Sequence, residues 1–138
     1  MKAVILAAGA GTRLGALTGQ MPKCLLPARG KPLLDRKLDA MASAGITDVT
    51  VVAGFEANRV IDHVAGRCRV VVNEDYRTTN SIVSLHCASA AVRGDPFLFQ
   101  NGDVLYSPDL MRRFVSAPYD NACLVDPLRP FVAGEYHV

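Results

Sequence analysis

The chain begins with a short apolar run that ends in a glycine-rich turn. Residues 4–7 (Val-Ile-Leu-Ala) predict a buried strand, because Val and Ile favour strands. Gly9 and Gly11 follow directly, and glycine lets the backbone approach a ligand closely and adopt a positive φ. Arg13 lies inside the turn, and Lys23 follows after a polar stretch. Backbone N–H groups in such a turn form a concave anion site, and the two cations add positive charge. The segment therefore predicts binding of a triphosphate.

Two common nucleotide-binding loops do not fit these residues. A dinucleotide fingerprint GxGxxG starting at Gly9 requires glycine at position 14, where this chain has leucine. A P-loop requires glycine followed directly by Lys and then Ser or Thr, and the chain contains neither GKS nor GKT. A tight strand-to-helix turn is the simpler interpretation of the glycines, but it does not explain Arg13 and Lys23.

The segment LAAGAGTRL, followed by PK and then by KCLLPARGKPLL, resembles the nucleotidyltransferases that couple a nucleoside triphosphate to a phosphorylated sugar or alcohol. In that family the glycine-rich loop, its arginine and the later lysine hold the triphosphate. The resemblance implies catalytic roles for Arg13 and Lys23. It assigns nucleotide binding to Leu6, Ala8, Gly9, Gly11, Thr12, Arg13 and Lys23.

Charge is distributed unevenly along the chain. Residues 1–34 contain basic residues and no Asp or Glu, whereas all thirteen acidic residues lie in residues 35–138. The overall net charge of +2 is too small for the basic footprint of a nucleic-acid-binding protein. A local positive excess beside a glycine-rich loop favours a small polyanion instead.

Length and composition limit the class of protein. The 138 residues, half of them hydrophobic, suit one domain with a buried core, which we expect to span residues 1–138. There is no apolar run of about 18 residues and no signal-peptide pattern at the N-terminus. The four cysteines are scattered without CxxC spacing, which argues against a zinc site or a disulfide framework. We therefore expect a cytoplasmic protein with reduced thiols and no membrane contact.

Strand-like and helix-like segments alternate. The predicted strands are residues 3–7, 48–53, 69–72, 97–100 and 122–125. The predicted helices are residues 32–45, 56–64, 81–92 and 108–115. This alternation predicts an α/β fold, Rossmann-like, with a mainly parallel sheet and helices on both faces. Ligands of such sheets bind beyond the carboxyl ends of the strands, where the glycine-rich turn follows the first strand.

A second informative segment is Asn101-Gly102-Asp103, which follows an apolar strand. Mg²⁺ binds one or two carboxylates together with phosphate oxygens, so a single carboxylate at a strand end is a reasonable ligand. The same residues also form ordinary turns. The family carries a Gly-Asp motif here, and its aspartate binds the metal that bridges the triphosphate and the attacking phosphate. The resemblance therefore implies a catalytic, Mg²⁺-binding role for Asp103.

Residues 73–85 narrow the family further. The pattern N-x-x-Y-x-x-T-N-x-x-S-L resembles the cytidylyltransferase branch that includes phosphocholine cytidylyltransferases and some inositol-phosphate enzymes. Sugar-nucleotide enzymes usually carry Gln-x-x-Pro-x-Gly here, and this chain has no such segment. Asn80 and Ser84 offer hydrogen-bonding groups suited to the edge of a pyrimidine. The alternative is a helix cap at Thr79 or Asn80 with a polar helix face.

These features predict an Mg²⁺-dependent nucleotidyltransferase that transfers a CMP group to a small phosphorylated alcohol such as phosphocholine. The expected partners are CTP or another nucleoside triphosphate and the phosphorylated acceptor, without nucleic acid. Two alternatives remain: a sugar-1-phosphate nucleotidyltransferase, and a nucleotide-binding half-domain without turnover. A preference for a base other than cytosine would distinguish the sugar-1-phosphate enzyme from the predicted one. Nucleotide binding without pyrophosphate release would identify the half-domain.

The resemblance reaches the end of the chain while the family continues beyond it. Residues 134–138 resemble the family's Glu-x-Met-Lys-Val segment, and His137 stands where a phosphate-binding lysine is expected. We therefore expect an incomplete nucleotidyltransferase domain that is truncated at its C-terminus. Its sheet would have an open edge that a second copy or a partner chain covers.

Overall fold

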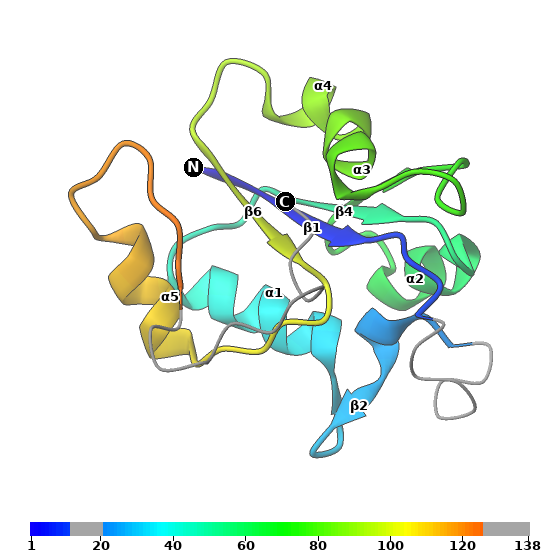
Figure 1. The fold of residues 1–138 in the computed structure, drawn as a ribbon. Helices are drawn as coiled ribbons and strands as arrows, with labels where there is room; N and C mark the ends of the chain where they lie inside the picture. Colours follow the sequence, from blue (N-terminus) through cyan, green and yellow to red (C-terminus); the bar gives the residue numbers. More distant parts are fainter. Residues whose placement is uncertain (12–20, 126–138) are drawn as a thin grey trace.

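A four-stranded parallel sheet forms the centre of the molecule (Figure 1). The computed structural model describes residues 1–11 and 21–125, so Thr12 and Arg13 lie outside the described residues. The strand order is β5-β4-β1-β6, and each neighbouring pair is parallel. These strands are β1 (Lys2–Ala7), β4 (Val49–Ala53), β5 (Arg69–Val72) and β6 (Phe97–Asn101).

Helices cover both faces of the sheet, which confirms the predicted α/β architecture (Figure 1). One face carries α1 (Leu33–Ser43), α2 (Ala57–Val64) and, beside α1, α5 (Pro108–Val115). The other face carries α3 (Ser81–Cys87) and α4 (Ser89–Val92). A short 3₁₀ helix, η2 (Lys23–Leu25), precedes α1. None of the helices in the described part of the chain is long and apolar enough to cross a membrane.

Alternating side chains of β1 supply both hydrophobic cores. Ala3 and Ile5 pack into the core under α1 and α2, whereas Val4 and Leu6 pack against α3 and α4. All four are almost fully buried, as expected for a central parallel strand covered on both faces. The burial of this strand explains why its sequence is continuously apolar rather than alternating.

Two predicted elements differ from the structure. Residues 122–125 form no strand, and Leu124 and Val125 are exposed (52% and 72%). An apolar run becomes a strand only where a neighbouring strand accepts its hydrogen bonds, and here none does. The predicted helix 81–92 is interrupted at Ala88, whose N–H bonds to Leu85 O at 3.0 Å. This tighter turn separates α3 from α4.

A small hairpin between η2 and α1 was not predicted. It pairs β2 (Pro27–Ala28) with β3 (Lys31–Pro32) in antiparallel orientation. The two connecting residues, Arg29 and Gly30, both have positive φ (50° and 77°). Positive φ at both positions is the requirement of a type I′ hairpin turn. Gly30 suits its position, but arginine is not among the residues that favour the first position, so the sequence carried only half of the usual signal.

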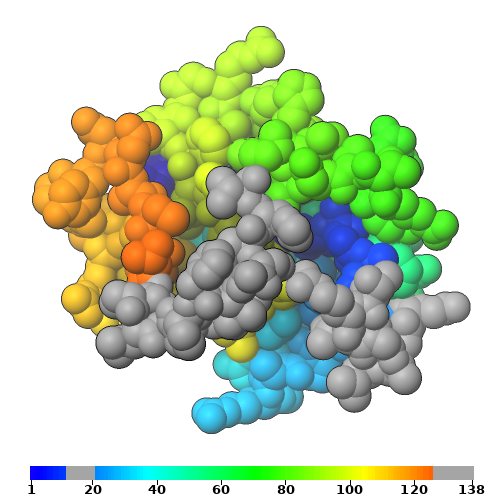
Figure 2. Space-filling model, in the orientation of Figure 1, coloured from blue at the N-terminus to red at the C-terminus, as the bar shows by residue number. Residues whose placement is uncertain are grey.

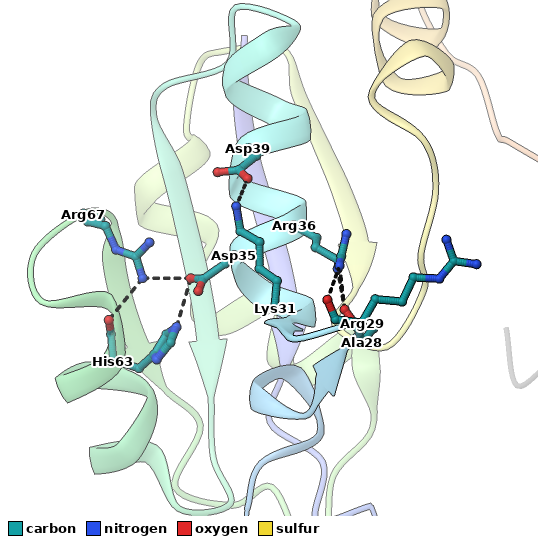
Figure 3. A network of polar contacts seen from close by, with 8 residues as sticks. All are labelled: Ala28, Arg29, Lys31, Asp35, Arg36, Asp39, His63 and Arg67. Carbon is teal, nitrogen blue, oxygen red and sulfur yellow. Dashed lines mark hydrogen bonds and ion pairs between the residues drawn. The ribbon is translucent and has the colours of Figure 1, made fainter.

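Polar contacts attach α1 to its neighbours (Figure 3). Asp35 Oδ1 accepts a hydrogen bond from Arg67 at 2.8 Å and lies 2.9 Å from His63 Nε2, which links α1 to α2 and the turn after it. Arg36 donates to the carbonyl of Ala28 in the hairpin, at 2.9 Å from Nε. Asp35 and Arg36 therefore fix the N-terminal end of α1.

Asp35→Asn should lower the free energy of unfolding by about 1–2 kcal/mol at pH 6, because it removes the charge that His63 and Arg67 contact. Burial alone raises the pKa of Asp35, but the hydrogen bonds from His63 and Arg67 outweigh burial and lower it below 3.8. A lowered carboxyl pKa stabilises the fold above its unfolded value, and this contribution disappears as the pH falls through the folded value.

Urea unfolding of both proteins at about pH 6 and about pH 3 measures this effect, and the wild-type advantage should shrink at the lower pH. Asp39→Asn on the same helix is the control, because its pair with Lys31 is exposed and should contribute little. A wild-type advantage that is the same at both pH values would contradict the assignment.

Candidate functional site

The carboxyl ends of β1 and β6 open into a cavity of about 340 Å³. Figure 2 shows dark-blue atoms of the N-terminal segment at the surface, next to green atoms of the segment that carries α3. Every predicted site residue that the structure describes lines this cavity: Leu6, Ala8, Gly9, Gly11, Lys23, Asn80, Ser84 and Asp103. The cavity therefore brings together segments from three distant parts of the sequence.

Close approach between two strand ends places Asp103 beside the glycine-rich turn. Leu6 of β1 pairs with Asn101 of β6, and Gly102 N donates to Leu6 O at 2.7 Å. A Cβ at Gly102 would lie 3.0 Å from Leu6 O and 3.1 Å from the side chain of Ala7. Glycine at 102 thus allows the backbone after β6 to stay against the end of β1, which directs the next residue, Asp103, to the cavity.

Lys23 lies across Gly11 and reaches toward Asp103. A Cβ at Gly11 would lie only 2.7 Å from Lys23 Cε, and Gly11 has φ of +69°. The ammonium of Lys23 is 3.6 Å from Asp103 Oδ2. An ion pair this long, with a half-exposed carboxylate, contributes little stability. Both charges are therefore available to a ligand that contacts them in the cavity.

Asn80 and Ser84 form the opposite wall of the cavity. Asn80 Oδ1 accepts from the N–H groups of Ile82 and Val83 at 3.1 and 3.3 Å, so Asn80 is the N-cap of α3. Capping occupies the amide oxygen of Asn80 but not its nitrogen. Ser84 is only 6% exposed, and its hydroxyl accepts a hydrogen bond from Asn73 at 3.0 Å.

Several lining residues were not among the predicted site residues. They are Ala7, Cys24, Tyr76, Thr79, Ser81, Asn101 and Gly102. Tyr76 lies within the pattern of residues 73–85, so a sequence signal was present. Gly54 makes room for it, because a Cβ at Gly54 would lie 2.7 Å from both Tyr76 Cβ and Ala8 O.

A buried lysine lies behind the loop that carries Asp103. Lys37 is 1% exposed; its ammonium donates to Gln100 Oε1 at 3.0 Å and lies 5.0 Å from the centre of the Tyr106 ring. Burial lowers the pKa of Lys37 to about 8, although Asp103 and Cys24 partly oppose this shift. The burial of Lys37 was not predicted from the sequence, since lysine on a helix usually faces water.

A second hollow, between the hairpin and residues 105–108, is larger (about 570 Å³) and partly basic. Two of its cationic side chains, Arg36 and Lys31, already contact oxygen atoms of the protein. Arg36 donates to the carbonyls of Ala28 and Arg29, and Lys31 pairs with Asp39. This hollow is therefore a poorer anion site than the glycine-lined cavity, whose backbone and Lys23 face the open space.

The cavity provides few protein ligands for a magnesium ion. In the described ranges, no three or more His, Cys, Asp or Glu residues gather in a way that could hold a metal. Asp103 supplies one half-exposed carboxylate at the cavity. Mg²⁺ usually takes one or two carboxylates and completes its shell with substrate phosphates and water. The residues therefore fit a magnesium ion that arrives with a triphosphate, not one held by protein alone.

Comparison with known proteins gives consistent matches. The family model described as MobA-like NTP transferase domain matches residues 3–134. CMP-5′-(3-aminopropyl)phosphonate synthase of Streptomyces rubellomurinus is 36% identical over 94% of this chain and 22% of its own length. N-acetylmuramate alpha-1-phosphate uridylyltransferase of Neisseria meningitidis is 34% identical over 85% of this chain and 53% of its own length.

A solved structure is also similar. The CTP:phosphocholine cytidylyltransferase of Streptococcus pneumoniae superposes with a TM-score of 0.66 and 31% identity, over 74% of this chain and 44% of that one. The chain therefore spans about half, or less, of the length of these matching proteins. The relatives differ in the nucleotide that their names state.

Lys37→Met should remove a dependence of stability on pH. The unfolded lysine has a pKa of 10.5 and the folded one a pKa of about 8, so the unfolded state binds more protons between these values. Wild-type stability should therefore rise with pH relative to the variant, by about 1.4 kcal/mol per pH unit between about pH 8 and 10.

Denaturant unfolding across this pH range measures the difference. Burial raises the pKa of the Cys24 thiol to about 11 and Lys37 partly opposes this shift, so both proteins also carry Cys24→Ala, which leaves Lys37 as the one of the two groups that titrates. Lys31→Met, which removes an exposed lysine, is the control and should show no such trend. A constant difference between wild type and Lys37→Met would show that Lys37 is not buried as a charged group.

Proposed function

The chain belongs to the family of MobA-like NTP transferase domains, and from this premise we propose that it transfers CMP from CTP to a small phosphorylated alcohol such as phosphocholine. Pyrophosphate is the second product. The observation that carries the proposal is the meeting of Gly11, Lys23 and Asp103 in one cavity. A glycine turn, a cation and a carboxylate are the groups that a metal-bound triphosphate requires.

The proposed reaction needs no general base. A phosphate oxygen of the acceptor attacks the α-phosphorus in line, a new P–O bond forms, and the bond to the bridging oxygen breaks with its electrons leaving on pyrophosphate. The attacking oxygen is already anionic near neutral pH. The protein must therefore align two polyanions and offset their repulsion, so positioning and electrostatics carry the catalysis.

Each charged residue has a defined part in this proposal. The Lys23 ammonium neutralises the triphosphate and the charge that develops on pyrophosphate, and Arg13, outside the described residues, is proposed to do the same. Asp103 would hold Mg²⁺, which when bound stabilises negative charge on the phosphates as a Lewis acid. The N–H groups of the turn around Gly9 and Gly11 bind phosphate oxygens.

Asn80 and Ser84 are proposed to contact the base. Support for cytosine comes from the pattern of residues 73–85 and from the two similar proteins whose names state CMP or CTP. The uridylyltransferase relative favours a second candidate, a sugar-1-phosphate nucleotidyltransferase with another base. The short span relative to these proteins favours a third, a nucleotide-binding half-domain without turnover.

Pyrophosphate release tests the proposal. The chain is incubated with Mg²⁺, with CTP or UTP, and with a panel of phosphorylated alcohols and sugar 1-phosphates, against a control without acceptor. Release that requires CTP and a phosphorylated alcohol supports the proposal. Release only with UTP and sugar 1-phosphates would favour the sugar-1-phosphate nucleotidyltransferase. CTP binding without any release of pyrophosphate would favour the half-domain without turnover.

Lys23→Ala and Asp103→Ala should each lower turnover by about 100-fold or more, because each removes a charge that the transition state contacts. Lys31→Ala and Asp109→Ala are matched controls, since they remove exposed charges of the same kinds away from the cavity. Unfolding midpoints should stay close to that of the wild type in all four variants. Full activity of Asp103→Ala would contradict its proposed role as the metal ligand.

A further inference from the structure

Asn73 connects three segments of the cavity wall. It follows β5, is 3% exposed, and its Nδ2 donates to Thr79 Oγ1 and to Ser84 Oγ, both at 3.0 Å. Its Oδ1 accepts from the N–H of Asp75 at 3.1 Å. Because a backbone N–H can only donate, the atom facing Asp75 must be the oxygen. The orientation of the Asn73 amide is therefore fixed by chemistry, and its two N–H groups must point at Thr79 and Ser84.

This orientation restricts the direction in which the Ser84 hydroxyl can donate. Ser84 Oγ accepts from Asn73, so its own proton must lie on another side. Among the residues that the structure describes, none accepts a hydrogen bond from this hydroxyl. Ser84 lines the cavity, so its O–H can serve a ligand there as a donor.

Thr79 and Asn80 differ in which of their hydrogen-bonding groups are already used within the protein. The Thr79 hydroxyl accepts from Asn73 and donates to the Asp75 carbonyl at 2.8 Å, so its proton is used within the loop. Asn80 uses its oxygen to cap α3, which leaves only its amide nitrogen, a donor, for a ligand. Ser84 and Asn80, the two side chains proposed to contact the base, therefore both offer donors.

We infer that Asn73 is a positioning residue that makes this wall a pair of donors, and that the wall thereby selects cytosine over uracil. Cytosine presents two adjacent acceptors, O2 and N3, and a pair of donors matches them. Uracil and thymine carry N–H at position 3, which would face a donor and leave both groups unsatisfied. The inference rests on the proposed function and adds to it the reason for the base preference.

Asn73→Asp tests the inference because it keeps the shape of the side chain and replaces its donors with acceptors. The Asp75 N–H still has an oxygen to bind, but Ser84 would now donate to the new carboxylate and turn its lone pairs to the cavity. The preference for CTP over UTP, measured as the ratio of dissociation constants by calorimetry, should fall about ten- to a hundred-fold. The same ratio taken from kcat/KM should fall in parallel.

Ser84→Ala keeps the inference testable if Asn73→Asp does not fold. Ser84→Ala removes one donor, so it should lower the preference for CTP over UTP without making UTP the preferred nucleotide. Thr79→Val is the matched control: it breaks the other hydrogen bond of Asn73 and should lower the unfolding midpoint while leaving the ratio unchanged. If Asn73 had only a structural role, Asn73→Asp and Ser84→Ala would lower stability, but neither would change the preference for CTP over UTP.

The outcomes separate this inference from the proposed function. If wild type binds CTP and UTP equally, or if both Asn73→Asp and Ser84→Ala keep the wild-type ratio, the inference is wrong while nucleotide binding stands. If wild type binds no nucleotide, the proposed function fails and the inference with it. A lower ratio in Ser84→Ala with an unchanged ratio in Thr79→Val supports the inference.

Discussion

The site depends on the position of β1 between two parallel strands. Because its neighbours β4 and β6 run in the same direction, all three strands end at one edge of the sheet, and the segments that follow them meet there. The hydrogen bond from Gly102 N to Leu6 O draws two of these ends together without any side chain between them. The glycine-rich turn and Asp103, almost a hundred residues apart in sequence, therefore share one cavity. A different strand order would separate them, whatever their chemistry.

Much of this fold follows from local sequence patterns. The buried strands are predicted correctly because a strand covered on both faces must be apolar throughout, and the helices because their apolar residues recur at helical spacing. Residues 122–125 show the limit of that logic. Their composition suits a strand, but a strand also requires ladder hydrogen bonds to a neighbour. Residues 122–125 make none, although the outer edge of β6 is unpaired in the described part of the chain. The expectation that a second copy or a partner chain covers this open edge of β6 stays a prediction.

The site was predictable in its residues more than in its contacts. The sequence motifs and the family resemblance that they carry identified Lys23, Asp103 and Ser84, and the structure brings all three to one cavity. The local sequence offered Asn80 both as a helix cap and as a base contact, and the structure shows the cap. That Asn73 donates to the Ser84 hydroxyl could not be predicted, because the direction of this hydrogen bond depends on how the buried amide is oriented in the folded chain. The burial of Lys37 could not be predicted from the sequence either. It occupies the apolar face of α1, between Leu34 and Met41, where its burial is visible only once the helix is packed.

We propose that one cavity, between the end of β1 and the start of α3, receives a nucleoside triphosphate. Backbone amide NMR of the chain during titration with CTP and Mg²⁺ tests it most directly, because every N–H near the ligand reports separately. We expect saturable shifts concentrated at Gly9, Gly11, Gly102 and Ser84, with little change at Arg29 in the hairpin. Shifts concentrated at the hairpin, or no saturable shifts at all, would contradict the account.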